Sequence, residues 1–201
     1  WGGGFLQEMG AIDFAGGTVV HINAGVSALV MALMIGKRED YRVGHPITPH
    51  NIMFVFLGTS FLWLGWFGFN AGSGLAADGI DANAFLVTHV ATATAAMTWM
   101  TVDWCFNKKP TTVGACTGAV AGLVAITPAA GTVDLLGAFA IGVITPIVCF
   151  IMVAAVKPYF KYDDALDAFG VHGVGGIIGS ILTGVFATQY ITGEGGVEGA
   201  L

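Results

Sequence analysis

The feature that most constrains this chain is a series of long apolar stretches separated by short connections. A helix that crosses a bilayer needs about 20 mostly apolar residues. Six stretches reach or approach that length: 14–36, 51–73, 83–106, 112–128, 134–156 and 168–189. Only 10% of the 201 residues are charged, against about 25% in an average soluble domain. The sequence therefore predicts an all-α polytopic membrane protein, with one transmembrane unit over residues 1–201.

The fourth stretch is short, and it ends at Thr127-Pro128. Its glycines at 114, 118 and 122 recur every four residues. Such a ridge of small residues lets the backbones of neighbouring membrane helices approach closely. We expect this helix to pack against other helices instead of facing lipid.

The basic residues lie in alternate connections, and this pattern predicts the orientation. They are Lys37, Arg38 and Arg42 after the first stretch, Lys108 and Lys109 after the third, and Lys157 and Lys161 after the fifth. The other connections carry only acidic charges, at Asp78, Asp81, Glu194 and Glu198. Because basic loops stay on the cytoplasmic side, the first stretch is expected to run inward.

Several function classes are unsupported. No basic cluster suits nucleic acid, and the formal net charge is −6. Cys105, Cys116 and Cys149 lack metal-ligand spacing, so we interpret them as small apolar residues instead of a metal site or disulfide. No nucleophile set or phosphate loop is present. We therefore expect neither an enzyme nor a cofactor.

Two histidines lie inside apolar stretches in similar surroundings. His21 follows Asp13 by eight residues, and His172 follows Asp164 by eight, each with an aromatic residue and glycine between. The first stretch is expected to run inward and the last outward, so the two copies point in opposite directions. This is the signature of an inverted repeat, which places binding sites near the middle of the membrane.

The spacing indicates roles for these four residues. Eight residues of helix span about 12 Å, so an aspartate at the membrane boundary leaves its histidine inside the bilayer. Helix capping is the simpler role for both aspartates, and direct contact with a permeant ion is the alternative. Two neutral imidazoles can share one N–H···N bond and keep a donor or acceptor for a small polar solute. The alternatives are purely structural histidines and a metal site, which lacks further ligands. His89 has no twin, and we interpret it as structural.

An aromatic run at 63–69 closes the second stretch, and Asn70 and Ser73 follow it. An aromatic belt at the membrane surface is one interpretation. A vestibule whose ring faces attract a small cation is the other.

Four segments resemble sequence motifs of the Amt/Mep/Rh ammonium transporters. They are 13–25, 65–73, 114–124 with Thr127-Pro128, and 169–177, and the likeness covers almost the whole chain in order. The resemblance implies about helices five to ten of an eleven-helix, inverted-repeat protomer that assembles as a homotrimer. We expect this chain to be part of a longer protein.

The resemblance also implies the site residues. They are the pore histidines His21 and His172, the helix-start carboxylates Asp13 and Asp164, the recruitment residues Trp1 and Ser73, and the gate and pore-lining residues Phe69, Trp66 and Thr127. The Trp/Ser pair favours the Amt branch. The implied activity is ammonium or ammonia transport across the cell membrane, a bacterial inner membrane or a plasma membrane, with methylammonium as a further candidate substrate. Net NH3 and electrogenic NH4+ transport both remain open.

Two further implications concern partners and an alternative function. A PII-type signalling protein is the expected cytoplasmic partner, and membrane lipid is the surrounding medium. An ammonium sensor, with the same core fused to a signalling domain, is the alternative function.

Overall fold

The computed structural model describes residues 3–45, 47–193, 196 and 198–200. Its elements in chain order are α1 Phe5–Glu8, η1 Gly17–Ile22, α2 Asn23–Ile35, α3 Glu39–Val43, α4 Ile52–Ala71, η2 Gly72–Gly74, α5 Gly79–Asn107, α6 Thr112–Ile126, α7 Leu135–Ile151, η3 Met152–Val156, α8 Lys157–Phe160, η4 Phe169–Gly173, α9 Val174–Phe186 and α10 Gln189–Thr192. The predicted all-helical membrane fold is confirmed.

Several of these elements join into longer continuous helices. Within the described residues, five are long and apolar enough to cross a membrane: Gly17–Ile35, Ile52–Gly74, Gly79–Asn107, Leu135–Phe160 and Phe169–Phe186. Each overlaps a predicted stretch, and the ends differ by a few residues. The helix in the fourth predicted stretch, α6, has 15 residues, fewer than the about 20 that a full span needs.

The short helix α6 forms the centre of the bundle. It packs against α5, α7 and α9, and residues 121–126 are all buried. Its glycine ridge faces α5, because a Cβ added at Gly118 or Gly122 would lie 2.7 Å from the carbonyl oxygen of Ala95 or Ala91. The close approach of α5 depends on this ridge, as the sequence predicts.

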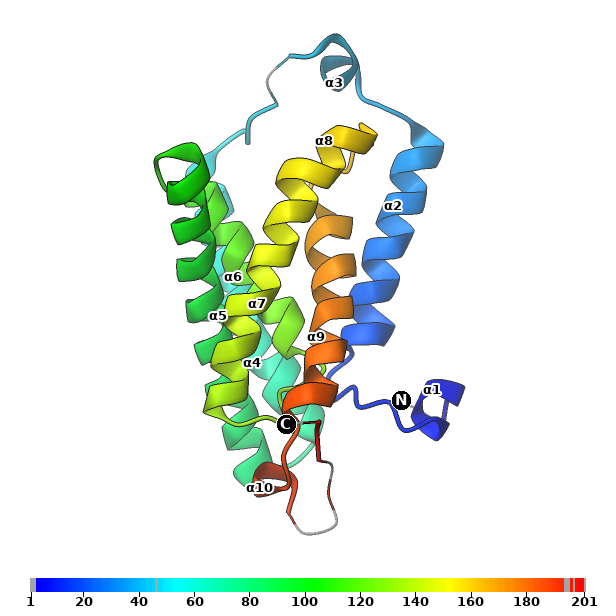
Figure 1. The fold of residues 1–201 in the computed structure, drawn as a ribbon, viewed down its shortest axis with the longest axis vertical. Coiled ribbons are helices and arrows are strands. Elements are labelled where there is room, and N and C mark those ends of the chain that lie inside the picture. The colour runs from blue at the N-terminus through cyan, green and yellow to red at the C-terminus, as the bar shows by residue number, and fades with distance from the viewer. Residues whose placement is uncertain (1–2, 46, 194–195, 197, 201) are drawn as a thin grey trace.

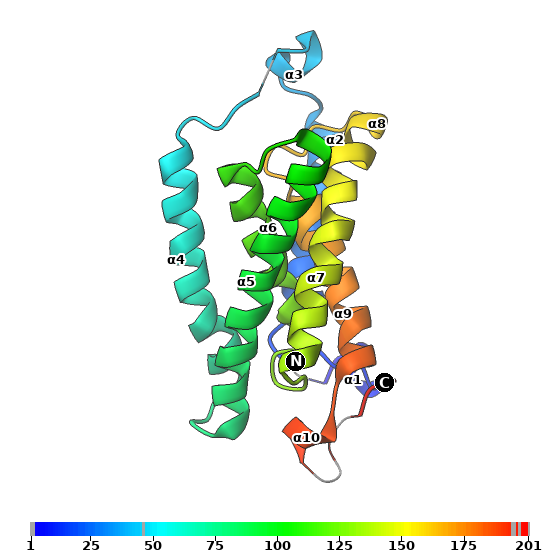
Figure 2. The ribbon, with the colours of Figure 1, turned by 60° about the vertical axis from the view of Figure 1, so that its left-hand side comes forward.

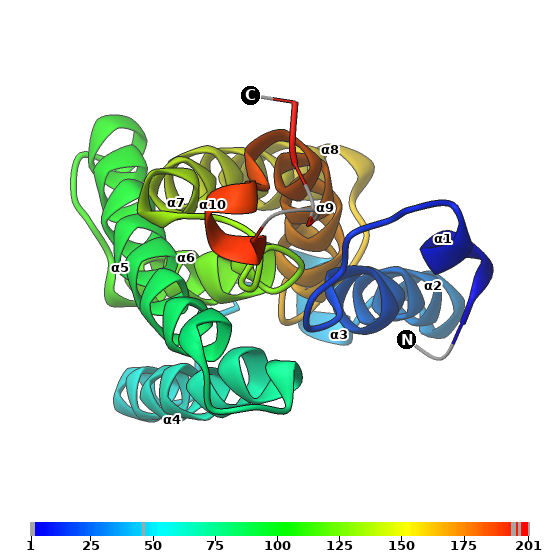
Figure 3. The same cartoon turned by 90° about the horizontal axis from the view of Figure 1, so that it is seen from below.

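The first and last long helices of the chain lie side by side. Figure 1 shows α2 next to α9, with α7 and α8 beside α9 and α5 on the far side. Contacts join η1 with α9 and α2 with η4. Figure 2 and Figure 3 place α4 as an outer layer against α5. Large apolar side chains of α4 face outward, including Met53, Phe61 and Leu64, so this face needs lipid or further protein.

The two ends of the bundle differ in charge. The connecting residues 36–45, 47–51, 108–111 and 161–168 lie at the upper end in Figure 1, together with α8, which begins at Lys157. All seven basic residues are at this end, which we call the basic end. The N-terminal ends of α5 and α7, capped by Asp78 and Asp134, lie toward the opposite end, as does the described N-terminal segment.

Candidate functional site

Each of the two aspartates caps the helix that carries one of the histidines. The carboxylate oxygens of Asp13 accept hydrogen bonds from the backbone N–H groups four and five residues later, at 2.5 and 3.0 Å. Those of Asp164 accept from the same relative positions, at 3.0 and 2.8 Å. A carboxylate at a helix N-terminus satisfies free N–H groups and complements the helix dipole. The capping interpretation therefore describes the observed contacts of both.

The backbone that follows each aspartate is also alike. Three residues later the chain is left-handed, at Gly16 with φ 110° and at Asp167 with φ 54°. Each helix then begins with a π-helical turn, η1 or η4, which contains the histidine. Such widened turns are rare and occur frequently at functional sites. No pattern in the sequence indicates these π-helical turns.

The two histidines meet where the first and last long helices cross. Their Nδ1 atoms are 3.3 Å apart, although 151 residues separate them in the sequence. One Nδ1 donates to the other, so the two rings are different tautomers. His21 is 4% exposed, and its Nε2 has no hydrogen-bond partner among the described residues. A buried ring nitrogen without a partner is unusual, and it leaves a position for a small polar solute.

Glycines make this crossing possible. Gly25 and Gly176 each lie four residues after one of the histidines. A Cβ on Gly25 would collide with the backbone of Gly173, and one on Gly176 would lie 2.9 Å from the carbonyl oxygen of Gly17. The two backbones are therefore in contact, which brings the imidazoles within hydrogen-bonding distance.

Aromatic rings from α4 surround His21. Trp66 stacks on it with ring centroids 5.2 Å apart and planes at 16°, and Phe69 meets it edge-on at 5.9 Å. The Trp66 indole Nε1 donates to Thr127 Oγ1 at 2.9 Å, in a buried contact. The structure thus places Trp66 and Phe69 against His21, with Thr127 bonded to Trp66 behind it.

The predicted recruitment pair is only partly described. Ser73 is half-buried, and its hydroxyl donates to the carbonyl of Phe69 at 2.7 Å, within its own helix. Trp1 lies outside the described residues. Ser73 is near the opposite end of the bundle, one turn beyond Phe69.

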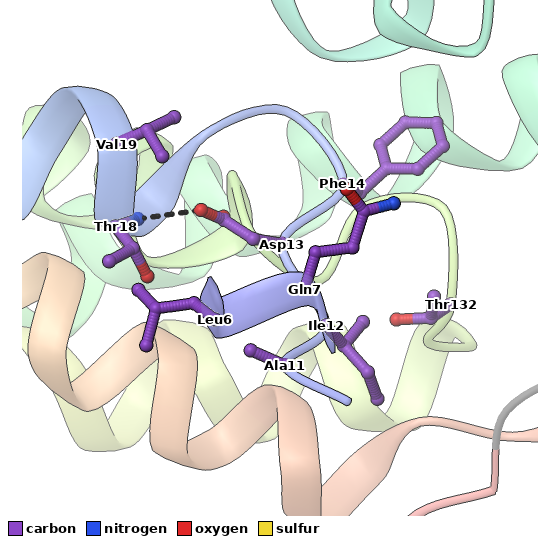
Figure 4. A pocket seen from close by; sticks show the side chains of 9 residues that line it. All are labelled: Leu6, Gln7, Ala11, Ile12, Asp13, Phe14, Thr18, Val19 and Thr132. Atoms are coloured by element: carbon purple, nitrogen blue, oxygen red, sulfur yellow. Dashed lines mark hydrogen bonds between the residues drawn. The ribbon is translucent and has the colours of Figure 1, made fainter. Parts of the chain in front are cut away.

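A pocket of about 220 Å³ lies beside the Asp13 cap at the opposite end. Figure 4 shows Asp13 turned toward Thr18, with Leu6 and Gln7 of α1 across from them. The hydroxyl of Thr18 lies 3.4 Å from that of Ser180 on α9. This pocket leads to the start of η1, one helix turn before His21.

Two adjoining pockets lie between His172 and the basic end. The first, of about 130 Å³, is lined by His172, Thr59 and Thr117 among others. The second, of about 490 Å³, shares Thr117 and Leu166 with it and extends past the basic-end connections. His172 therefore lines a pocket that shares residues with a larger one at the basic end. The sequence does not indicate either pocket.

The described residues contain no group of three or more His, Cys, Asp or Glu side chains that could hold a metal ion. Two ring nitrogens alone give half of the four ligands that a structural zinc site takes.

The profile of the Ammonium Transporter Family matches residues 1–201. The chain belongs to this family. It is 56% identical to an ammonium transporter of Aquifex aeolicus, over 98% of this chain and 46% of that protein. It is 52% identical to an ammonium transporter of Bacillus subtilis, over 97% of this chain and 48% of that protein. The family comprises transporters, not enzymes, and this member of it is a multi-pass protein of the cell membrane.

Solved structures give the same result. The chain matches Mep2 of Saccharomyces cerevisiae with a TM-score of 0.86 and 46% identity, over 94% of this chain and 42% of that one. It matches a structure titled Sensor Amt Protein with a TM-score of 0.88 and 39% identity, over 94% and 47% of the two chains. The chain spans about half the length of the relatives it matches.

Two ion pairs at the basic end were not predicted. Arg38 donates to the carboxylate of Asp163 from its backbone N, Nε and Nη2, at 2.8, 2.9 and 2.6 Å. These bonds lower the pKa of Asp163. Because 125 residues separate the partners, no local sequence pattern indicates this pair.

The second pair involves Lys157 and the turn before η4. Its Nζ donates to Asp167 Oδ1 at 2.5 Å and to the backbone carbonyl of Asp164 at 2.8 Å. Burial raises the pKa of Asp167, and the neighbouring ammonium group opposes that shift.

Proposed function

We propose that the full-length protein carries ammonium across the cell membrane, and that the nitrogen passes the pair His21 and His172. The observation that carries this proposal is the hydrogen-bonded histidine pair with a free buried Nε2, in a chain of the ammonium transporter family. An ionisable side chain at membrane depth is a functional residue by default.

The charge distribution supports an orientation with the basic end in the cytoplasm. Ser73 and the 220 Å³ pocket beside Asp13 then lie toward the outside. A cysteine placed at Lys37 or Lys108, with the exposed Cys105 replaced by serine, is expected to label only from the cytoplasm. Labelling from outside in intact cells would contradict this orientation.

The route begins with a cation and continues with a smaller neutral species. The outer aromatic and hydroxyl groups, Trp1 and Ser73, recruit NH4+, since ring faces attract cations. Carrying a bare cation into apolar surroundings costs several kcal/mol. Phe69 and Trp66 exclude water around His21, so NH4+ gives its proton to the free Nε2 of His21 near this gate. The hydrogen bond between the two rings passes a proton on through His172, so the transport carries charge. Ammonia then exchanges hydrogen bonds with the histidine ring nitrogens and moves toward the basic end.

The test is ammonium-evoked current from the full-length protein in liposomes on a supported membrane. His21→Ala and His172→Ala are each expected to lower the current or its selectivity. The double variant is expected to be little worse than the more severe single one, because hydrogen-bonded partners act as a unit. His21→Asp keeps a group that holds a cation, and it is expected to relax discrimination among cations.

His89→Ala is the matched control. This third intramembrane histidine is exposed, and its ring lies against those of Trp63 and Phe67 on α4, away from the histidine pair. The yield of folded oligomer is measured for every variant. A well-folded double alanine variant with normal current and selectivity would contradict the role of the pair.

A second candidate is an ammonium sensor. The observation in its favour is the match to the structure titled Sensor Amt Protein. A signalling domain in the full-length sequence, together with ammonium binding without current, would favour this function over transport.

Two partners belong to the same proposal. The outward apolar face of α4 fits assembly as a homotrimer, and the basic-end connections fit a PII-type protein in the cytoplasm. Native mass measurement of the full-length protein tests the first, and co-purification with a PII-type protein at low and high ammonium tests the second.

A further inference from the structure

The turn between Asp13 and η1 and the turn between Asp164 and η4 have the same backbone conformation but different residues at the left-handed position. We call them the outer and the inner half of the site. In the outer half the left-handed position is Gly16, which adopts φ 110° without steric conflict. In the inner half the same position is Asp167, with φ 54°. An L-residue other than glycine is strained there, although aspartate tolerates it better than most. The inner turn therefore needs a contact that the outer turn does not.

Lys157 supplies such a contact. Its Nζ binds the side chain of Asp167 and the backbone carbonyl of Asp164 at the same time. The side chains of Lys157 and Asp167 are only 19% and 27% exposed, so the pair is largely shielded from water and salt. The side-chain amine of Lys157 thus holds both ends of the turn that leads into η4.

This turn determines where His172 points. Asp164 caps η4 at the N–H groups of Ala168 and Phe169, and His172 follows within the same π-helical turn. A displacement of the cap would be carried along the helix to the imidazole. The hydrogen bond between the two histidines would be lost if His172 moved away by a small distance, because the Nδ1 atoms are already 3.3 Å apart.

We propose that Lys157 is a positioning residue for His172, holding the left-handed turn at Asp167 so that the two imidazoles meet. Lys157 acts through the backbone and not on the substrate. Its ammonium group is already bonded at two positions on the turn, and its positive charge repels a cation. The inference deepens the proposed function, on which its transport readout rests.

Three variants of the full-length protein test this role: Lys157→Met, Asp167→Gly and the double variant. Lys157→Met keeps the apolar stem but removes the anchor. A misplacement of about 1 Å in a reacting geometry lowers rates by about a hundredfold, so we expect the ratio of ammonium to potassium current to fall by about tenfold or more. Asp167→Gly in the same chain is expected to restore most of that ratio, because glycine adopts the turn without an anchor, as Gly16 does.

The decisive readout does not depend on transport. Nitrogen-15 NMR of labelled histidines in liposomes detects the coupling across the N–H···N bond. We expect this coupling in the wild type and the double variant, and its loss in Lys157→Met. Lys161→Met is the matched control, since Lys161 is exposed in the same segment, and it is expected to keep both coupling and current.

Two results would overturn the proposal: an intact histidine coupling in Lys157→Met, or a double variant no better than Lys157→Met. If Lys157→Met yields no folded protein, Lys157→Gln, which keeps a neutral donor, takes its place. A wild type that shows the coupling but no ammonium current would instead contradict the proposed function.

Discussion

One hydroxyl orients the ring that covers the central histidine. Thr127 Oγ1 accepts the indole N–H of Trp66 and donates to the carbonyl of Leu123, while its own carbonyl accepts from the N–H of Ala15. Thr127 is fully buried, so water cannot replace any of these bonds. The stacking of Trp66 on His21 thus depends on a single side chain at the end of α6.

Thr127→Val tests this dependence. Valine keeps the shape but leaves the indole N–H buried without a partner, which costs about 1–3 kcal/mol. We expect a lower melting temperature in detergent and a reduced ammonium current. Thr101→Val is the control, since this exposed threonine bonds only to its own helix, and a change within about 0.5 kcal/mol is expected. Equal melting temperatures for the two variants would contradict the assigned role.

A separate prediction concerns the recruitment residues, Trp1 and Ser73. Trp1→Leu combined with Ser73→Ala is expected to weaken apparent ammonium affinity, because a cation over an aromatic face gains about 0.5–2 kcal/mol. The measurement is current against ammonium concentration in the full-length protein. An unchanged concentration dependence would leave these residues as an interfacial belt only.

At the scale of elements, the site consists of two capped π-helical turns that cross at glycines. The sequence indicated two equivalent helix starts, because each has an aspartate eight residues before a histidine within one local segment. It did not predict η1 and η4, since a π-helical turn depends on how the cap and the crossing helix fit together. Nor did it predict the pair of Arg38 and Asp163, whose partners are distant in sequence. The short fourth stretch was predicted to be packed by its glycine ridge, and α6 is buried accordingly.

Because the two histidine-bearing helices touch at Gly25, we expect Gly25→Ala to be strongly destabilising. An added Cβ would collide with the backbone of Gly173, and overpacking of this kind costs about 1–3 kcal/mol. We expect a lower yield of folded protein and loss of the coupling between the histidines. Gly58→Ala is the control, because open space surrounds Gly58 in α4 and alanine favours a helix by up to about 1 kcal/mol. The crossing would be less tight than described if both variants behaved alike.

At the scale of the whole molecule, the basic end ties together segments from opposite ends of the chain. Arg38 follows the first long helix, and Asp163 precedes the last. The carboxylate of Asp163 is 2% exposed and accepts three hydrogen bonds from Arg38. This pair therefore links the two helices that carry the histidines at the basic end.

The Arg38–Asp163 pair makes stability depend on pH in a defined direction. Because its bonds lower the pKa of Asp163 from the ordinary 3.8, the stabilisation is complete above that value and is lost as the pH falls through the lowered pKa. Asp167 acts in the opposite sense, since burial raises its pKa, and its contribution declines as the pH rises above 3.8.

The measurement compares the melting temperature of the wild type with that of Asp163→Asn across this range. The difference is expected to be largest at neutral pH and to disappear at strongly acidic pH. A difference that stays constant with pH would show that Asp163 contributes through packing and not through its charge.

The separation of the two histidines also has a consequence for how the protein is made. Translation adds about 5–20 residues per second, so roughly 8–30 s pass between synthesis of His21 and of its partner 151 residues later. During that time the helix that carries His21 has no second imidazole to bond. The hydrogen-bonded pair, and the close helix crossing around it, can form only after the helix that carries His172 has been made.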